Sequence, residues 1–197
     1  MRSPSPVSSR VLTAALLAAA TAAGGVAVAE QRRLELDPER TEVSFELGAT
    51  LHTVEGTARL TEGVVTFDPE SGTASGSLVV DASSADTDND KRDRDMHVKV
   101  LESEDHPRIV FRPTAVRGDV PSEGEGPVEV DGVFSIHGAE HELTVDAVVR
   151  VAGDEVEAEV EFEVPYVDWG MKDPSKLLLK VDKKVTVRIR GVGTLTG

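Results

Sequence analysis

The sequence predicts an all-β domain that is interrupted by one short helix. Apolar and polar residues alternate over most of the chain, turn-forming residues separate the alternating runs, and one polar stretch breaks the pattern with helical spacing. Successive side chains of a strand point to opposite faces, so alternation with one apolar face indicates half-buried antiparallel strands. About eight such runs are present, which leaves a sandwich or a closed barrel as candidate architectures.

The clearest strand is predicted between Val156 and Tyr166. Its even positions are apolar, whereas glutamate occupies every odd position from 155 to 163. Clusters of glycine, proline and aspartate separate the predicted strands and indicate turns. The same alternation predicts further strands at residues 43–47, 65–67, 78–80, 109–111 and 185–189.

The helix is predicted within residues 86–106, where the alternation stops. Met96 and Val100 are four residues apart, as are His97 and Leu101. This spacing places each pair on one side of a helix. The segment also holds a dense set of charged residues, so we expect a short polar helix that plugs or covers the β structure.

The first 29 residues have the pattern of a secretory signal peptide. Arginines precede an alanine- and leucine-rich stretch, and Ala27-Val28-Ala29 forms a small-x-small cleavage site before Glu30. The stretch is too weakly apolar for a stable membrane anchor. We therefore expect a signal peptide over residues 1–29 and one domain over residues 30–197, without a membrane span and located in the periplasm or secreted.

Composition narrows the classes of partner. The chain has 36 acidic and 21 basic residues, for a formal net charge of −15 at pH 7. Such a chain repels phosphate backbones, which argues against nucleic acid as a partner. We expect most of the acids to form a solvated outer surface, with some pairing across strands. The chain has no cysteine, which excludes disulfides and thiolate metal sites.

The histidines allow a metal hypothesis. His137 and His141 are four residues apart, but a predicted two-residue hairpin loop at Gly138-Ala139 would pair His137 with Glu140. His141 would then point inward and His137 outward, so that one ion could not bind both. The alternative to a binding protein is a metal-dependent hydrolase or isomerase that uses His52, His97 and His141 at the mouth of a barrel.

Catalysis has little support in the sequence. None of the serines lies in a nucleophile elbow, and the carboxylates follow the periodicity of a sheet. We therefore expect a binding protein with no catalytic residue, no metal and no cofactor.

Five motifs follow one another in an order that resembles the YceI-like family. The order extends over residues 34–194. The motifs are the strand from Val43 to Leu47, the helix with Arg92-Asp93 and Met96-His97, Pro107-x-Ile109-x-Phe111, Gly132-x-Phe134-x-Ile136-x-Gly138, and Asp168-Trp169-Gly170-Met171.

The resemblance implies a single lipocalin-like antiparallel barrel of eight strands, closed by a short helix and exported by bacteria. Characterised relatives hold a polyisoprenoid chain in the barrel, and some form homodimers. This chain departs from the common pattern at the mouth of the barrel. Many relatives have Arg-Asp-x-His-Leu followed by two phenylalanines, whereas Met96-His97 is followed by no aromatic pair here.

Physical reasoning also favours a container. The interior of an eight-stranded barrel is either filled by side chains or left open for one small ligand. Only 4% of the chain is aromatic and many inward positions are valine or alanine, so a long apolar guest would supply missing volume. The alternative is a flattened and fully packed barrel. The predicted cavity residues are Phe45, Leu47, Phe67, Phe111, Phe134, Ile136, Leu143, Phe162, Val164 and Trp169.

The polar end of such a ligand needs donors at the mouth. We expect an isoprenoid quinone or a polyprenyl phosphate, held for storage or transport, and arginine or histidine would bind either head group. Alternatively, Arg92 and Arg94 pair with the neighbouring aspartates. The predicted head-group residues are Arg92, Arg94, His97, His52 and His141.

Overall fold

The computed structural model describes residues 31–50, 52–175 and 180–197. The predicted signal peptide over residues 1–29 and the cleavage before Glu30 lie outside these residues. The elements are β1 (Arg32–Leu36), β2 (Glu42–Gly48), β3 (Thr53–Phe67), β4 (Ala74–Asp86), α1 (Asp90–Lys99), β5 (Arg108–Arg117), β6 (Gly124–Ile136), β7 (Ala139–Ala152), β8 (Glu155–Val164) and β9 (Val185–Thr196).

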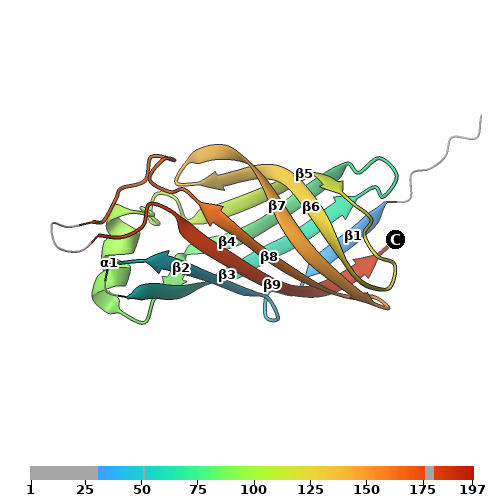
Figure 1. Cartoon of the computed structure of the whole chain (residues 1–197), viewed down its shortest axis with the longest axis horizontal. Coiled ribbons are helices and arrows are strands. Elements are labelled where there is room, and N and C mark those ends of the chain that lie inside the picture. The colour runs from blue at the N-terminus through green and yellow to red at the C-terminus, as the bar shows by residue number, and fades with distance from the viewer. Residues whose placement is uncertain (1–30, 51, 176–179) are drawn as a thin grey trace, which may run out of the picture.

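The strands close into one antiparallel barrel (Figure 1). Each strand from β3 to β9 pairs with the next one along the chain, and β9 pairs back to β1 and β2. Both β1 and β2 also pair with β3, so together they fill one barrel position. The prediction of an eight-stranded barrel with a short helix is confirmed.

The turn between β6 and β7 differs from its prediction by one residue. Ile136 pairs with Ala139, so the loop is His137-Gly138 rather than Gly138-Ala139. A type I′ turn needs positive φ at both central residues, and here φ is 52° at His137 and 75° at Gly138. Glycine takes this conformation freely and histidine does so more readily than most residues. The inward direction of His141 is retained, because it pairs with Phe134.

The two ends of the barrel differ in how they are filled. At the end where β1 begins and β9 finishes, Phe67, Val151 and Val156 belong to one buried apolar cluster. We call this the packed end. At the opposite end, which α1 covers in Figure 1, a second cluster includes Phe134, Val164 and Tyr166. We call this the hollow end, because the cavity described below lies there.

Charged side chains cover the outer face, as predicted. Arg188 on β9 lies between Glu161 on β8 and Glu46 on β2 and pairs with both. Lys184 Nζ pairs with Glu163 Oε2 at 2.7 Å. These exposed pairs each contribute little stability. Within the described ranges, no helix is long and apolar enough to cross a membrane.

Candidate ligand cavity

A cavity of about 460 Å³ occupies the hollow end. Its wall comes mainly from strands β2 to β6, β8 and β9 and from the first turns of α1, and it is almost entirely apolar. Every second residue of a barrel strand points inward, and apolar residues at these positions form such a wall. Six of the predicted cavity residues line it, namely Phe45, Leu47, Phe134, Ile136, Phe162 and Val164.

The other four predicted residues lie elsewhere. Phe67 is buried in the cluster of the packed end, far along β3 from the cavity. Phe111, Leu143 and Trp169 pack against the cluster around Phe134 and are not part of the cavity lining. The sequence pattern gives the face of a residue but not its position along the barrel axis, which explains the misplacement of Phe67.

The prediction also omitted part of the wall. Val185, Val187 and Ile189 of β9 line the cavity, as do the small residues Ala58 and Ala85. The alternation at 185–189 was a sufficient signal for the β9 residues. Tyr166 and Met171 also line the cavity. Tyr166 continues the apolar even positions of the predicted strand, although β8 itself ends at Val164, whereas Met171 lies in a segment without periodicity.

Arg92 lines the cavity with a guanidinium that is held by hydrogen bonds. The Asn89 side chain caps α1 by accepting a hydrogen bond from Arg92 N at 3.0 Å. The Arg92 guanidinium donates through Nε to Thr87 Oγ1 at 2.7 Å and through Nη2 to the Thr87 carbonyl at 2.6 Å. Thr87 is buried, and Lys91 lines the cavity beside Arg92. The guanidinium is therefore held by two hydrogen bonds to Thr87.

His97 attaches α1 to the barrel. Its Nε2 bonds to the Ala85 carbonyl at 2.9 Å, and its Nδ1 bonds to Ser103 Oγ at 3.0 Å. Because the carbonyl can only accept, Nε2 carries a proton. Both ring nitrogens are thus used in fixing α1 to the end of β4 and to the following loop, and His97 is not part of the cavity wall.

The remaining predicted head-group residues are dispersed. His52 is exposed and lines the cavity, whereas Arg94 is exposed and does not. His141 stacks on Trp169 with 4.0 Å between ring centroids and 5° between planes. Its Nε2 is buried without a hydrogen-bond partner. Among the described residues, His52, His97 and His141 form no common metal-binding group, so the site that the enzyme alternative requires is not assembled.

Tyr166 adds a polar group to the wall. Its hydroxyl donates to the Asp182 carbonyl at 2.8 Å. Burial, together with the negative charges of Asp173 and Asp182, raises the pKa of Tyr166 to about 12. The phenol therefore stays neutral over the physiological range and anchors the segment after β8 to the one before β9.

Comparisons with known proteins agree with this architecture. The structure resembles BcnA from Burkholderia cenocepacia, with 19% identity and a TM-score of 0.64 over 80% of this chain and 98% of that one. A polyisoprenoid binding domain from Saccharophagus degradans, implicated in plant cell wall breakdown, has 18% identity and a TM-score of 0.64 over 82% and 97% of the two chains.

A YceI protein of Campylobacter jejuni has 14% identity and a TM-score of 0.56, over 74% of this chain and 86% of that one. No curated protein matches the chain in sequence. The structural likenesses show the shared fold. The model of the YceI-like domain matches residues 34–192, and the chain therefore belongs to the YceI-like family.

Proposed function

We propose that this protein is an exported binding protein that holds a long apolar lipid of the polyisoprenoid class, for storage or transport. The observation that carries the proposal is the cavity of about 460 Å³ at one end of an otherwise packed barrel. Its size lies within the usual range of small-molecule sites, and its wall offers apolar contact on all sides. A flexible hydrocarbon chain fits such a wall because it needs no polar partners.

The relatives support this class of ligand. The similar domain from Saccharophagus degradans is a polyisoprenoid binding domain. The sides of the cavity here are formed by valine, alanine, phenylalanine and isoleucine, and these side chains suit a branched isoprenoid as well as a straight chain.

The head group is proposed to lie beside α1. Lys91 and Arg92 provide positive charge at the cavity in a protein of net charge −15. Arg92 is already oriented by two hydrogen bonds to Thr87, so little side-chain entropy is lost when an anion or a carbonyl oxygen binds. A polyprenyl phosphate or an isoprenoid quinone fits this arrangement.

Mass spectrometry of organic extracts from the natively purified protein tests the ligand class directly. We expect an isoprenoid lipid in a stoichiometric amount. A cavity that carries only straight-chain fatty acids, or nothing, would contradict the polyisoprenoid assignment. N-terminal sequencing of the exported form tests the proposed start at Glu30.

A cavity-filling variant tests the location. Ala58→Phe adds an aromatic ring where a small residue lines the cavity, so we expect a folded protein with strongly reduced lipid uptake. Val148→Phe adds similar bulk on the exterior, because Val148 is 44% exposed on β7, and is the matched control. Normal uptake by a folded Ala58→Phe variant would place the lipid outside the barrel.

Removal of the oriented cation tests the head-group assignment. Arg92→Ala should weaken the binding of a polyprenyl phosphate about tenfold or more, because charge-assisted hydrogen bonds are lost. A plain hydrocarbon of equal length should bind almost as before. Equal losses for both ligands would mean that Arg92 acts through the position of α1 alone.

A further inference from the structure

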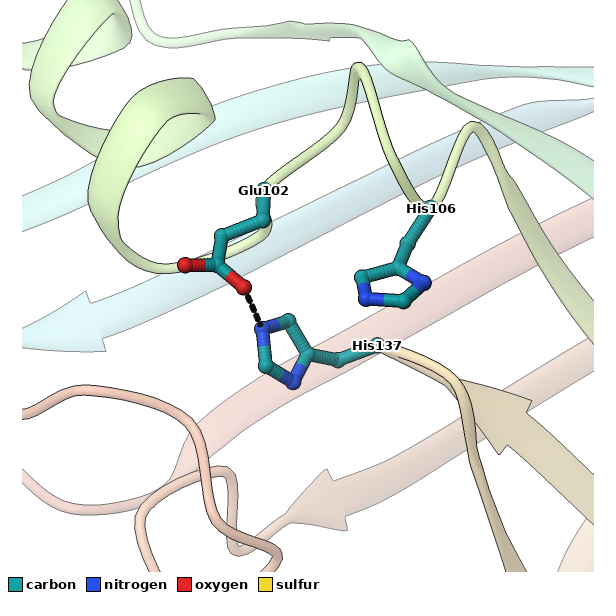
Figure 2. A group of neighbouring side chains, drawn as sticks. All are labelled: Glu102, His106 and His137. Carbon is teal, nitrogen blue, oxygen red and sulfur yellow. Dashed lines mark hydrogen bonds and ion pairs between the residues drawn. The ribbon is translucent and has the colours of Figure 1, made fainter.

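A cluster of three side chains that can bind a metal ion lies outside the cavity lining. Glu102 and His106 belong to the connection between α1 and β5, and His137 belongs to the turn between β6 and β7 (Figure 2). One carboxylate oxygen and one nitrogen from each ring all lie within 4.8 Å of one another. Figure 2 shows the three side chains converging from these two segments.

The cluster is held by specific contacts. His137 Nε2 and Glu102 Oε2 are 2.8 Å apart, within hydrogen-bond distance. The rings of His106 and His137 are 4.9 Å apart between centroids. His106 also covers Gly138, since a Cβ at that position would come within 2.8 Å of the imidazole Cε1. The hairpin glycine thus provides the space in which His106 approaches His137.

The backbone directs these side chains toward each other. Glu102 and His137 have positive φ angles of 47° and 52°, a conformation that few residues other than glycine adopt. The amides of Asp105 and His106 both donate to the Glu102 carbonyl at 2.9 Å, which fixes a tight turn. The side chain of Glu102 is 47% exposed and that of His137 is 21% exposed, so an ion can reach both.

We propose that Glu102, His106 and His137 bind one divalent transition-metal ion, with Zn²⁺ as the ion that suits them best. Two imidazole nitrogens and one carboxylate oxygen are preferred zinc ligands. A tetrahedral site with bonds of about 2.1 Å needs ligand atoms about 3.4 Å apart. The ligand atoms of the cluster, which lie within 4.8 Å of one another, approach further when the ion binds. The metal displaces the proton between His137 Nε2 and Glu102 Oε2 to the solvent, and a water molecule completes the fourth position.

The site has a structural consequence at the hollow end. Leu101 and Ile136, the chain neighbours of Glu102 and His137, both line the cavity. A bound ion would therefore join the segment behind α1 to the β6–β7 turn at the edge of the cavity. This inference is independent of the identity of the lipid.

Zinc titration of the untagged mature protein, followed by competition with a chromophoric chelator, tests the site. We expect one Zn²⁺ per chain, with affinity reduced about tenfold or more in Glu102→Gln and His137→Asn. Asparagine is chosen because it tolerates positive φ. His52→Asn alters an exposed histidine outside the cluster and should leave zinc binding unchanged.

Imidazole NMR signals of the wild-type protein provide a measurement that needs no variant to fold. Zn²⁺ should perturb the signals of His106 and His137 first. The absence of stoichiometric binding, equal affinity in the cluster variants, or perturbation centred on His97 or His141 would each overturn the proposal.

Discussion

The two ends of the barrel share strands β3 to β9, with β1 completing the packed end and β2 the hollow end, yet one end is solid and the other encloses a cavity. At the packed end, Val151 and Val156 are each only 1% exposed and pair with each other between β7 and β8. At the hollow end, the cavity wall combines the small residues Ala58 and Ala85 with the aromatic residues Phe45 and Phe162. The strand pairing differs as well, because residues 161–164 of β8, which lie at the hollow end, have no partner on β7. Small inward side chains and this break in the pairing therefore both accompany the cavity.

The two ends contribute differently, because the packed end stabilises the barrel and the hollow end encloses the space proposed to hold a ligand. Burial of apolar surface stabilises the barrel mainly where side chains fill it, and the hollow end forgoes part of this stabilisation. The elements that move during binding usually come from the less stable part of a fold. The attachment of α1 depends on a few polar contacts of His97, Thr87 and Arg92, which suits a removable cover.

The largest effect is expected from matched valine-to-alanine substitutions at the two ends. Val151→Ala removes contacts in the packed core and should lower the free energy of unfolding by about 2 to 3 kcal/mol. Val187→Ala enlarges an existing cavity and should cost about 1 kcal/mol. Urea denaturation of both ligand-free variants measures the difference. Equal losses would show that the hollow end is as tightly packed as the other.

His97→Ala tests the attachment of the helix. Loss of the bonds to the Ala85 carbonyl and to Ser103 should reduce stability by about 1 to 2 kcal/mol. Hydrogen exchange should accelerate in α1 but not in β7. Because the helix is loosened as a whole, headgroup-bearing lipids and plain hydrocarbons should both dissociate faster. A loss confined to headgroup-bearing lipids would instead assign His97 a direct contact.

The sequence was sufficient for the class of fold. Alternation at 156–166 marked a half-buried strand, and the four-residue spacing around Met96 and His97 marked the helix. The sequence did not give the division of one barrel position between β1 and β2, because that division depends on pairing with β3 and β9. The hairpin at His137-Gly138 was misplaced by one residue, since a single glycine fits either position of the loop.

The site was less predictable than the fold. Phe45 and Phe162 line the cavity, but Phe67 has the same alternating pattern and lies at the packed end. The cluster of Glu102, His106 and His137 has no recognisable spacing, because its members come from two segments that meet only in the folded barrel. The periodicity of the sequence predicts the face of the sheet to which a side chain points. The position of a residue along the barrel axis, and the contacts between segments far apart in the sequence, depend on how the strands close into the barrel.

Tyr166→Phe tests a single hydrogen bond at the hollow end. Removal of the bond to the Asp182 carbonyl should cost about 1 kcal/mol at neutral pH. Tyr166 is the sole tyrosine of the chain, so ultraviolet titration reports its pKa directly, with an expected value of about 12. Because the folded pKa lies above the unfolded value, its stabilising contribution should disappear as the pH rises from about 10 toward 12. A midpoint near 10 in the folded protein would show that the phenol is solvated.

The smallest effect is expected from Asp68→Asn at the packed end. The Asp68 carboxylate accepts hydrogen bonds from the Ser71 hydroxyl at 2.8 Å and from the Glu70 amide at 2.8 Å in the turn between β3 and β4. These bonds, with that of the Ser71 hydroxyl the largest, hold the pKa of Asp68 below its ordinary value. Asparagine keeps an acceptor for the amide but loses the charge, so the variant should be slightly less stable at pH 7.

The lowered pKa of Asp68 determines how the stability difference between the two proteins changes with pH. A carboxyl group with a lowered folded pKa stabilises the protein above its unfolded pKa of about 3.9, and this contribution is lost as the pH falls through the folded value. The Asp68→Asn variant has no such contribution to lose, so the stabilities of the two proteins should converge below about pH 4. Denaturation curves at pH 7 and in the acid range measure this convergence. A difference that stays constant over the whole range would mean that Asp68 acts through the shape of the turn and not through its charge.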